Sequence, residues 1–176
     1  AIEAVTGNCL DKNLQKYLCH PLNLEQTSFN PSQSSRENLA SVYFKDSEGI
    51  YSDISSKMTL GLNPFHYGGG GITSTLNDYL KILQFLLKRM KSGKKSSIVP
   101  QMFINQIGNS EISPLKSFNK VLASDYDIYP NIEKSWGYGL LLNNQPLKTG
   151  RSANSGSWAG VLNTYFWIDY RLSLIH

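Results

Sequence analysis

A serine and a lysine separated by two residues can carry out acyl transfer when both lie on one helix face, because the lysine can then activate the hydroxyl. The chain has this spacing three times, at Ser92–Lys95, Ser113–Lys116 and Ser117–Lys120. The chemistry requires the start of a helix. Ser92 instead follows a run with helical periodicity, and the other two serines fall in a loop-like segment. A self-standing hydrolase that uses Ser113 or Ser117 is therefore only a weaker alternative.

Other reactive side chains form no recognisable constellation. The histidines at 20, 66 and 176 are isolated, and the two cysteines, Cys9 and Cys19, have no metal-ligand spacing. We expect no metal and no cofactor. A Ser-His-Asp triad assembled in space stays open, as does a disulfide between the two cysteines.

Four consecutive glycines, residues 68–71, precede the clearest helical pattern of the chain. A glycine-rich loop before a helix can hold a phosphate, but this one lacks the Lys-Ser/Thr of a Walker loop and the partners of a dinucleotide fingerprint. The run is better interpreted as a tight turn or as the rim of a site.

The composition is that of a folded domain, with 176 residues of which 40% are hydrophobic and 17% charged. The net charge of +4 is scattered, and the one basic run, residues 88–95, falls at the end of a predicted helix, where cations are favourable. We therefore expect no nucleic-acid partner. No apolar run reaches the length of a membrane span, so no transmembrane segment is expected.

Helices are predicted mainly in the first two thirds of the chain. The strongest covers residues 75–92, with apolar residues at three- and four-residue steps and a capping box in which Thr75 and Asp78 satisfy amides at its start. Three weaker helices are expected: residues 1–7 ended by Gly7, one that begins at Asp11 and is ended by His20-Pro21-Leu22, and a short one from Pro100 to Gly108. Residues 28–38 are expected to form a loop, and residues 46–66 show no clear periodicity.

Strands are predicted at residues 39–45, 137–142, 158–161 and 165–168, the last two joined near Asn163. Residues 109–134 form a loop-rich insert. Helices followed by antiparallel strands predict an α/β (α+β) fold, either as a complete domain or as part of a mixed fold.

Five segments occur in an order typical of one enzyme family. They are Ile2–Gly7 (IEAVTG), Pro21–Thr27 (PLNLEQT), Gly69–Tyr79 (GGGITSTLNDY), Gly137–Leu140 (GYGL) and Gly156–Asp169 (GSWAGVLNTYFWID). Together they resemble serine β-lactamases of class C and their penicillin-binding-protein-like esterase relatives. The resemblance spans nearly the whole chain and implies a partial β-lactamase/DD-peptidase-like fold. Asn23 and Ala159 stand where the family usually has glycine.

The resemblance also implies site residues. Trp158-Ala159-Gly160 holds the place of the family's third signature, and Lys148-Thr149-Gly150, which has the letters of that signature, is interpreted as a chance triplet in the preceding turn. By resemblance, the amide of Val161 is one oxyanion donor. The segment from Trp158 to Gly160 would contact the substrate, together with Gly70 and Gly71. A tryptophan in place of the signature lysine favours neutral esters.

Two family signatures have no counterpart at the expected place. The nucleophile motif Ser-x-x-Lys and the following Tyr-x-Asn precede the first matched segment in the family, and Tyr129-Pro130-Asn131 comes too late in the chain to be the latter. Residues 1–176 are therefore expected to be the C-terminal part of a single serine hydrolase domain. Its partners would be the N-terminal half of that domain and a small-molecule ester or β-lactam, or a D-amino-acid peptide. A non-catalytic binding or scaffolding relative is the alternative.

Overall fold

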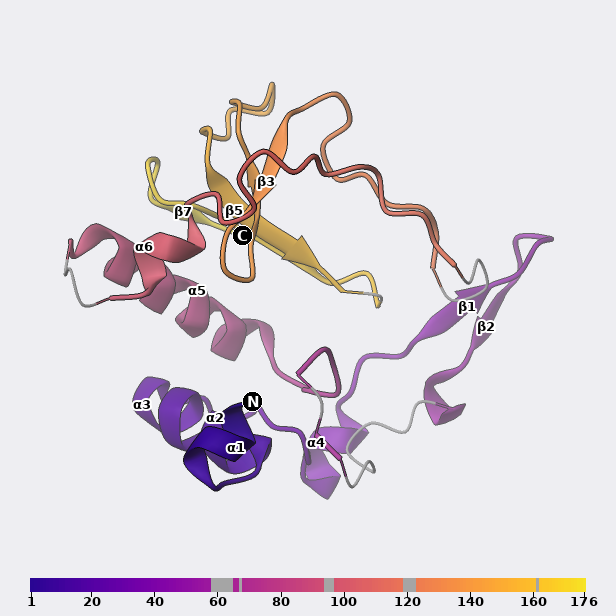
Figure 1. Ribbon diagram of the computed structural model, residues 1–176. Helices are drawn as coiled ribbons and strands as arrows, with labels where there is room; N and C mark the ends of the chain where they lie inside the picture. The colour runs from indigo at the N-terminus through magenta and orange to yellow at the C-terminus, as the bar shows by residue number, and fades with distance from the viewer. Residues whose placement is uncertain (58–64, 67, 94–96, 119–122, 161) are drawn as a thin grey trace. The chain divides into compact units, whose positions relative to one another are not determined.

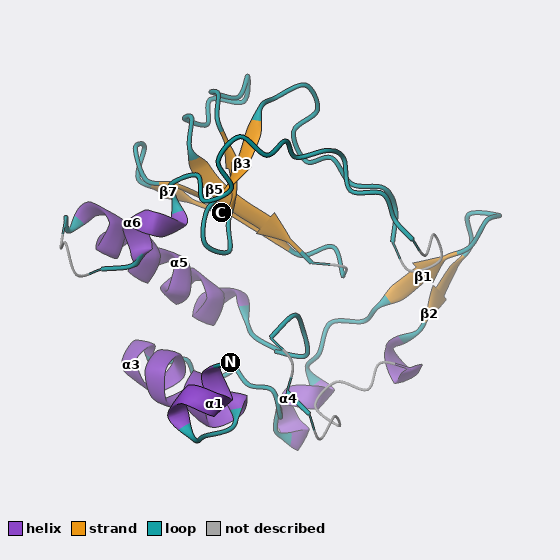
Figure 2. Cartoon of the chain, viewed as in Figure 1, coloured by secondary structure: helices purple, strands orange, loops and turns teal. Residues whose placement is uncertain are grey.

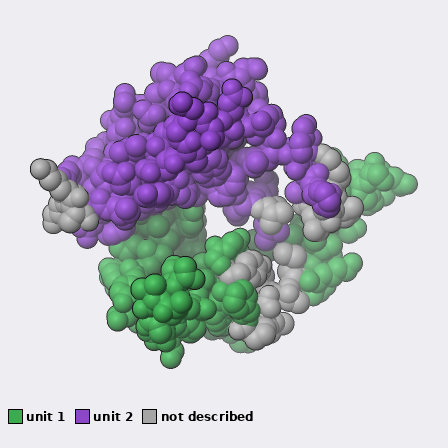
Figure 3. Space-filling view, in the orientation of Figure 1, with its two compact units in different colours: residues 1–82 green, residues 83–176 purple. Residues whose placement is uncertain are grey.

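The structure, a computed structural model, describes residues 1–57, 65–66, 68–93, 97–118, 123–160 and 162–176. The chain divides into two compact units, residues 1–82 and residues 83–176, which are coloured separately in Figure 3. The boundary falls within the longest helix, α5 (Leu76–Lys91).

The first unit begins with helices (Figure 2). Helix α1 (Ile2–Thr6) ends at Gly7, whose φ of 67° is the left-handed conformation predicted for a helix cap. Helix α2 (Leu10–Leu14) continues through a π-helical turn, η1 (Gln15–Cys19), into α3 (His20–Leu22). The helix ends at Leu22, the last residue of the predicted His20-Pro21-Leu22 stop, but it does not stop before the proline as expected. Pro21 therefore lies inside the last turn of a continuous helix, directly after the π-helical turn, and Asn23 caps the helix in the left-handed conformation.

Three further elements, α4, β2 and η2, lie where the sequence predicted none. Helix α4 (Gln33–Glu37) falls inside the predicted loop, because the Ser32 hydroxyl accepts a hydrogen bond from the Ser35 amide and caps the helix start. The predicted strand 39–45 is limited to β1 (Tyr43–Lys45), which pairs antiparallel with β2 (Tyr51–Asp53). A short 3-10 helix, η2 (Ser55–Lys57), follows.

Helix α5 confirms the strongest sequence prediction, but its capping box is only half correct. The Thr75 hydroxyl accepts a hydrogen bond from the Asp78 amide (3.3 Å). The Asp78 carboxylate accepts instead from the Gln26 amide (2.8 Å) and the Thr27 hydroxyl (3.0 Å). Burial alone would raise the pKa of Asp78, but these bonds and one from Lys81 outweigh it and hold the pKa below its ordinary value. Asp78 thus ties a distant loop to the helix start.

The second unit contains a five-stranded antiparallel sheet with its strands in chain order, in orange to yellow in Figure 1. The strands are β3 (Lys134–Trp136), β4 (Leu141–Asn143), β5 (Ser155–Ala159), β6 (Tyr165–Asp169) and β7 (Leu174–Ile175). This confirms a mixed fold in which helices precede antiparallel strands. Residues 109–118 and 123–133 contain no helix or multi-residue strand, as the predicted insert requires.

The predicted strand 137–142 is wrong in its first half. Residues 137–140 form the turn between β3 and β4, closed by a hydrogen bond from the Gly137 amide to the Leu140 carbonyl (2.9 Å). A Cβ atom at Gly137 would lie 1.8 Å from the carbonyl oxygen of Met102, the last residue of helix α6 (Val99–Met102). The predicted helix from Pro100 to Gly108 ends early, at this contact.

The core of the second unit lies where the sheet meets the chain after α6. Its buried apolar side chains include Phe103, Leu140, Leu142 and Ile168. Gly156 on β5 is closely packed there, since a Cβ would lie 2.6 Å from Leu140 and 3.0 Å from Phe103. Across the described residues, no helix is long and apolar enough to cross a membrane.

Candidate functional site

The segment predicted to replace the third signature lies at the end of β5. Trp158 pairs with Phe166 and Ala159 with Tyr165 on β6. The strand then turns at Gly160, whose amide donates to the Thr164 carbonyl (2.7 Å). A Cβ at Gly160 would lie 2.7 Å from the Thr164 hydroxyl oxygen, so the turn itself already requires a small residue here.

Three other predicted site residues remain without a test. Val161 lies outside the described residues, so its role as an oxyanion donor stays a prediction. Gly70 and Gly71 belong to the first unit. Gly71 has a φ of 86° and packs near Phe29, so a structural reason for this glycine also exists.

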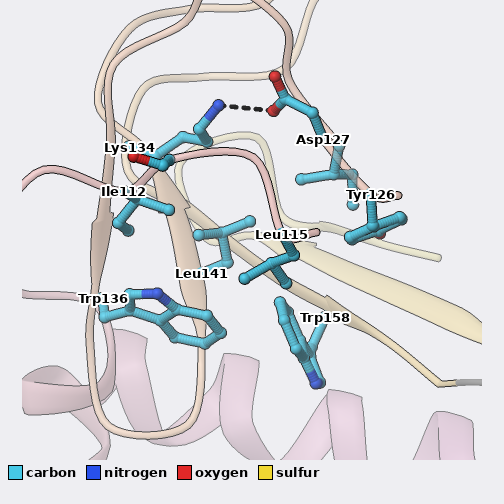
Figure 4. Close-up of a pocket in the computed structure, with 10 residues that line it drawn as sticks. Ile112, Leu115, Tyr126, Asp127, Lys134, Trp136, Leu141 and Trp158 are labelled. Carbon is cyan, nitrogen blue, oxygen red and sulfur yellow. Dashed lines mark hydrogen bonds and ion pairs between the residues drawn. The ribbon is translucent and has the colours of Figure 1, made fainter. Parts of the chain in front are cut away.

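A small pocket lies beside Trp158 in the second unit (Figure 4). The rings of Trp158 and Trp136 meet edge to face with their centroids 4.7 Å apart, and the ring of Tyr126 is 6.3 Å from that of Trp158. The volume is about 20 Å³. The lining residues are Ile112, Ser113, Leu115, Tyr126, Asp127, Ile128, Lys134, Trp136, Leu141 and Trp158.

Sequence reasoning missed the other walls of this pocket, because they come from the insert, from β3 and from the start of β4. Leu115 and Tyr126 form an isolated antiparallel bridge, in which each amide donates to the other's carbonyl (2.9 Å). This bridge holds two segments of the insert together. The available signal was the presence of apolar and aromatic residues within an otherwise polar stretch.

The charged groups of the pocket neutralise each other. The Lys134 ammonium lies 2.7 Å from an Asp127 carboxylate oxygen and also donates to the Tyr129 carbonyl (3.0 Å). Only 8% of the Lys134 side chain is exposed. In Figure 4 the ammonium points toward Asp127 and away from the two indole rings. The lysine is therefore committed to protein partners.

Ser157, the residue before Trp158 on β5, belongs to a buried polar cluster. The hydroxyls of Ser157 and Tyr129 are hydrogen-bonded at 2.7 Å, and the Arg151 guanidinium donates to the Tyr129 oxygen. The guanidinium also lies over the rings of Tyr129 (4.9 Å) and Trp167 (5.0 Å). Tyr129 of the Tyr-Pro-Asn triplet is thus part of the packing of the sheet.

Asp169, at the end of β6, fixes two neighbouring turns. Its buried carboxylate accepts hydrogen bonds from the amides of Ser152 (2.7 Å), Arg171 and Leu172 (both 3.0 Å). Burial alone would raise the pKa of Asp169, but these bonds outweigh it, so the pKa lies below its ordinary value. This explains an aspartate at the end of the matched Gly156–Asp169 segment.

The alternative signatures lie in places unsuited to the chemistry. Lys148-Thr149-Gly150 occupies an exposed turn between β4 and β5, as predicted. Ser92 follows the end of α5. Ser113 is not on a helix, and Lys116 pairs with Asp125 at 2.9 Å.

Within the part of the chain that is described, no group of three or more His, Cys, Asp or Glu residues could hold a metal ion. Cys9 and Cys19 are both free thiols.

The order of helices and antiparallel strands and the five matched segments agree with a β-lactamase-like architecture. The Beta-lactamase family model matches residues 1–175, so the chain belongs to this family. The search of curated proteins gave no match.

Solved structures with a similar fold include a LovD6 mutant of simvastatin synthase (LovD) from Aspergillus terreus, with 22% identity and a TM-score of 0.77. Unliganded selenomethionyl LovD from Aspergillus terreus has 24% identity and a TM-score of 0.75. EstCE1, a hydrolase with promiscuous acyltransferase activity, has 18% identity and a TM-score of 0.71. Each match covers 99% of this chain but only 45–46% of the other, so the chain spans less than half the length of these proteins.

Proposed function

We propose that the chain is the C-terminal part of a β-lactamase-like serine hydrolase domain that forms an acyl-enzyme with neutral esters. The observation that carries the proposal is the place of Trp158 at the end of β5, beside an aromatic pocket. Membership of the Beta-lactamase family and the fold shared with LovD and EstCE1 support the general class. β-Lactams and D-amino-acid peptides are the less favoured substrates.

The mechanism divides the work between two parts of the domain. A serine supplied by the N-terminal half attacks the ester carbonyl, and its proton passes through the lysine and tyrosine of that half to the departing alcohol. Water then attacks the acyl-enzyme and releases the acid. Residues 1–176 would supply the amide of Val161, which stabilises the oxyanion, and Trp158, which packs beside the substrate. Gly160 lets the acyl group approach the backbone.

Charge favours an ester without a carboxylate. A lysine at the third signature would attract the carboxylate of a β-lactam, whereas Trp158 offers an apolar surface. Lys134, a buried cation that lines the pocket beside Trp158, is already paired with Asp127. An anionic substrate placed against this face would therefore lose water without gaining a free cation, which costs binding energy.

The non-catalytic alternative gains no support from the two departures from the family pattern. Asn23 adopts φ 52°, a left-handed conformation that asparagine tolerates better than most residues. Ala159 is an ordinary strand residue paired with Tyr165. Both substitutions fit their backbone positions, so neither by itself indicates a lost activity.

Labelling with a fluorophosphonate tests the proposal. The full-length protein should gain the mass of one adduct and lose p-nitrophenyl acetate hydrolysis in parallel, with the labelled serine outside residues 1–176. The control variant Ser113→Ala/Ser117→Ala should label like the wild type. An adduct on Ser113 or Ser117 would transfer the nucleophile to this chain, and a protein with neither adduct nor turnover would support the non-catalytic alternative.

A further inference from the structure

We propose that the β1–β2 hairpin binds the same hairpin of a second copy of the chain, through one of its two faces. This hairpin face consists of Tyr43, Lys45, Tyr51 and Asp53. The inference assigns an interaction surface to the first unit and does not depend on the proposed function. The partner is a second copy because the charges of the hairpin face are complementary to their own arrangement.

The antiparallel register places the four side chains of the hairpin face at the corners of a rectangle. In the hairpin (Figure 1), Tyr43 lies opposite Asp53, and Lys45 lies opposite Tyr51. Residues that are two apart on a strand share a face. The Lys45 ammonium accordingly lies 5.4 Å from the centroid of the Tyr51 ring. The two tyrosines therefore occupy one diagonal of the rectangle, and the two charges occupy the other.

The hairpin face is exposed and carries two unpaired charges. Tyr43 is 59% exposed and Tyr51 64%. Lys45 and Asp53 are also exposed, and within the described residues neither has an ion-pair partner. Hydrogen bonds from the Ser55 hydroxyl and amide hold the pKa of Asp53 below its ordinary value, so its carboxylate is negative. Two strands alone are marginally stable in water, so a partner that covers both tyrosines stabilises the hairpin.

A two-fold axis along the tyrosine diagonal makes the hairpin face self-complementary. When two copies pack face to face about this axis, each tyrosine meets the same tyrosine of the other copy. Lys45 of one copy then meets Asp53 of the other, and the reciprocal pair forms by symmetry. The two hairpins cross at about a right angle, as in orthogonal packing of sheets. Two aromatic contacts and two ion pairs therefore form together.

The other face-to-face arrangements leave the charges unpaired. A two-fold axis parallel or perpendicular to the strands places each charge over a tyrosine, and an axis along the charge diagonal places each charge against its own copy. The contact is also small, because four side chains per copy are far fewer than the roughly 20 residues a side of a standard interface. We therefore expect a weak dimer that depends on concentration and weakens as salt screens its ion pairs.

Charge reversal in the full-length protein tests this arrangement by sedimentation velocity over a range of concentrations. The wild type should dimerise, and Lys45→Glu and Asp53→Lys should each raise the dissociation constant of the dimer about tenfold or more, because each brings like charges together twice. An equimolar mixture of the two variants should dimerise again, since one hairpin face is then negative and the other positive. The matched control is Lys16→Glu. Lys16 is exposed and lies 5.0 Å from the centroid of the Tyr17 ring, so its reversal should leave the dimer unchanged.

Recovery in the mixture is the outcome that only this arrangement predicts, and it also shows that both variants are folded. A wild type that stays monomeric at every concentration would overturn the proposal. A dimer that survives both single reversals would overturn it as well, because another surface then joins the copies. Loss of the dimer in both variants without recovery in the mixture would refute the pairing of Lys45 with Asp53 between copies.

Discussion

The buried hydroxyl pair of Tyr129 and Ser157 gives the sharpest test of how the sheet is held. Tyr129 is 7% exposed and Ser157 1%. In Tyr129→Phe, the Ser157 hydroxyl keeps only a long bond to the Leu141 carbonyl (3.4 Å), and the Arg151 guanidinium loses its phenolic acceptor. A buried polar group left without a partner costs about 1–3 kcal/mol. We expect Tyr129→Phe to lower the free energy of unfolding by about 2 kcal/mol, and Ser157→Ala by about 1 kcal/mol.

Urea unfolding of the wild type, the two single variants and the double variant measures the pair directly. The double variant should lose about 1 kcal/mol less than the sum of the single losses, because the two hydroxyls share one interaction. Tyr138→Phe, at a tyrosine with 52% exposure, is the control and should stay within about 0.5 kcal/mol of the wild type. Additive losses would refute the coupling. A hundredfold loss of esterase activity in Tyr129→Phe with unchanged stability would show that this tyrosine belongs to the active site.

Three further predictions concern stability and thiol chemistry. The pKa of Asp169 is lowered in the folded state, so its stabilising contribution is present above about pH 4 and is lost as the pH falls through the lowered value. Asp169→Asn should lower the free energy of unfolding by about 1–3 kcal/mol at pH 7. In unfolding curves, the difference in this free energy between the variant and the wild type should become smaller below about pH 4. Gly137→Ala should cost more than about 3 kcal/mol in thermal unfolding, because its Cβ would overlap a backbone carbonyl that cannot move away. Ellman's reagent should titrate Cys9 in the folded protein but Cys19 only in denaturant, because burial removes the Cys19 thiol from solvent and raises its pKa.

The sequence predicted best the elements whose signals are local. Helix α5 combines apolar periodicity with a capping hydroxyl at Thr75, and α1 ends at a glycine in the left-handed conformation. Strand β6 begins with four consecutive β-forming residues, 165–168. In each of these elements, short-range chemistry and long-range packing favour the same structure.

The errors arose where a distant contact determines the backbone. The local pattern predicts that Gly137 lies in a strand. In the structure the backbone of Met102 lies against Gly137, and residues 137–140 form a turn. The local pattern predicts that the Asp78 carboxylate is part of a capping box, but in the structure it accepts hydrogen bonds from Gln26 and Thr27. Local patterns cannot supply partners that are 35 to 52 residues away.

The same distinction applies to the candidate site. Trp158 could be selected from the sequence because it lies in a matched segment, but the pocket beside it needs the bridge between Leu115 and Tyr126 and the neighbouring strand that carries Trp136. No local spacing relates these residues.

On the proposed function, a tryptophan in place of the signature lysine affects substrate choice only if no other cation takes over the lost charge. Among the described residues of the second unit, Lys134 is held by Asp127, and the Arg151 guanidinium lies over the rings of Tyr129 and Trp167. Lys148, in the exposed turn before β5, is surrounded by water, where a single ion pair contributes about 1 kcal/mol at most. Trp158→Lys should therefore raise kcat/KM for substrates that carry a carboxylate and lower it for neutral esters.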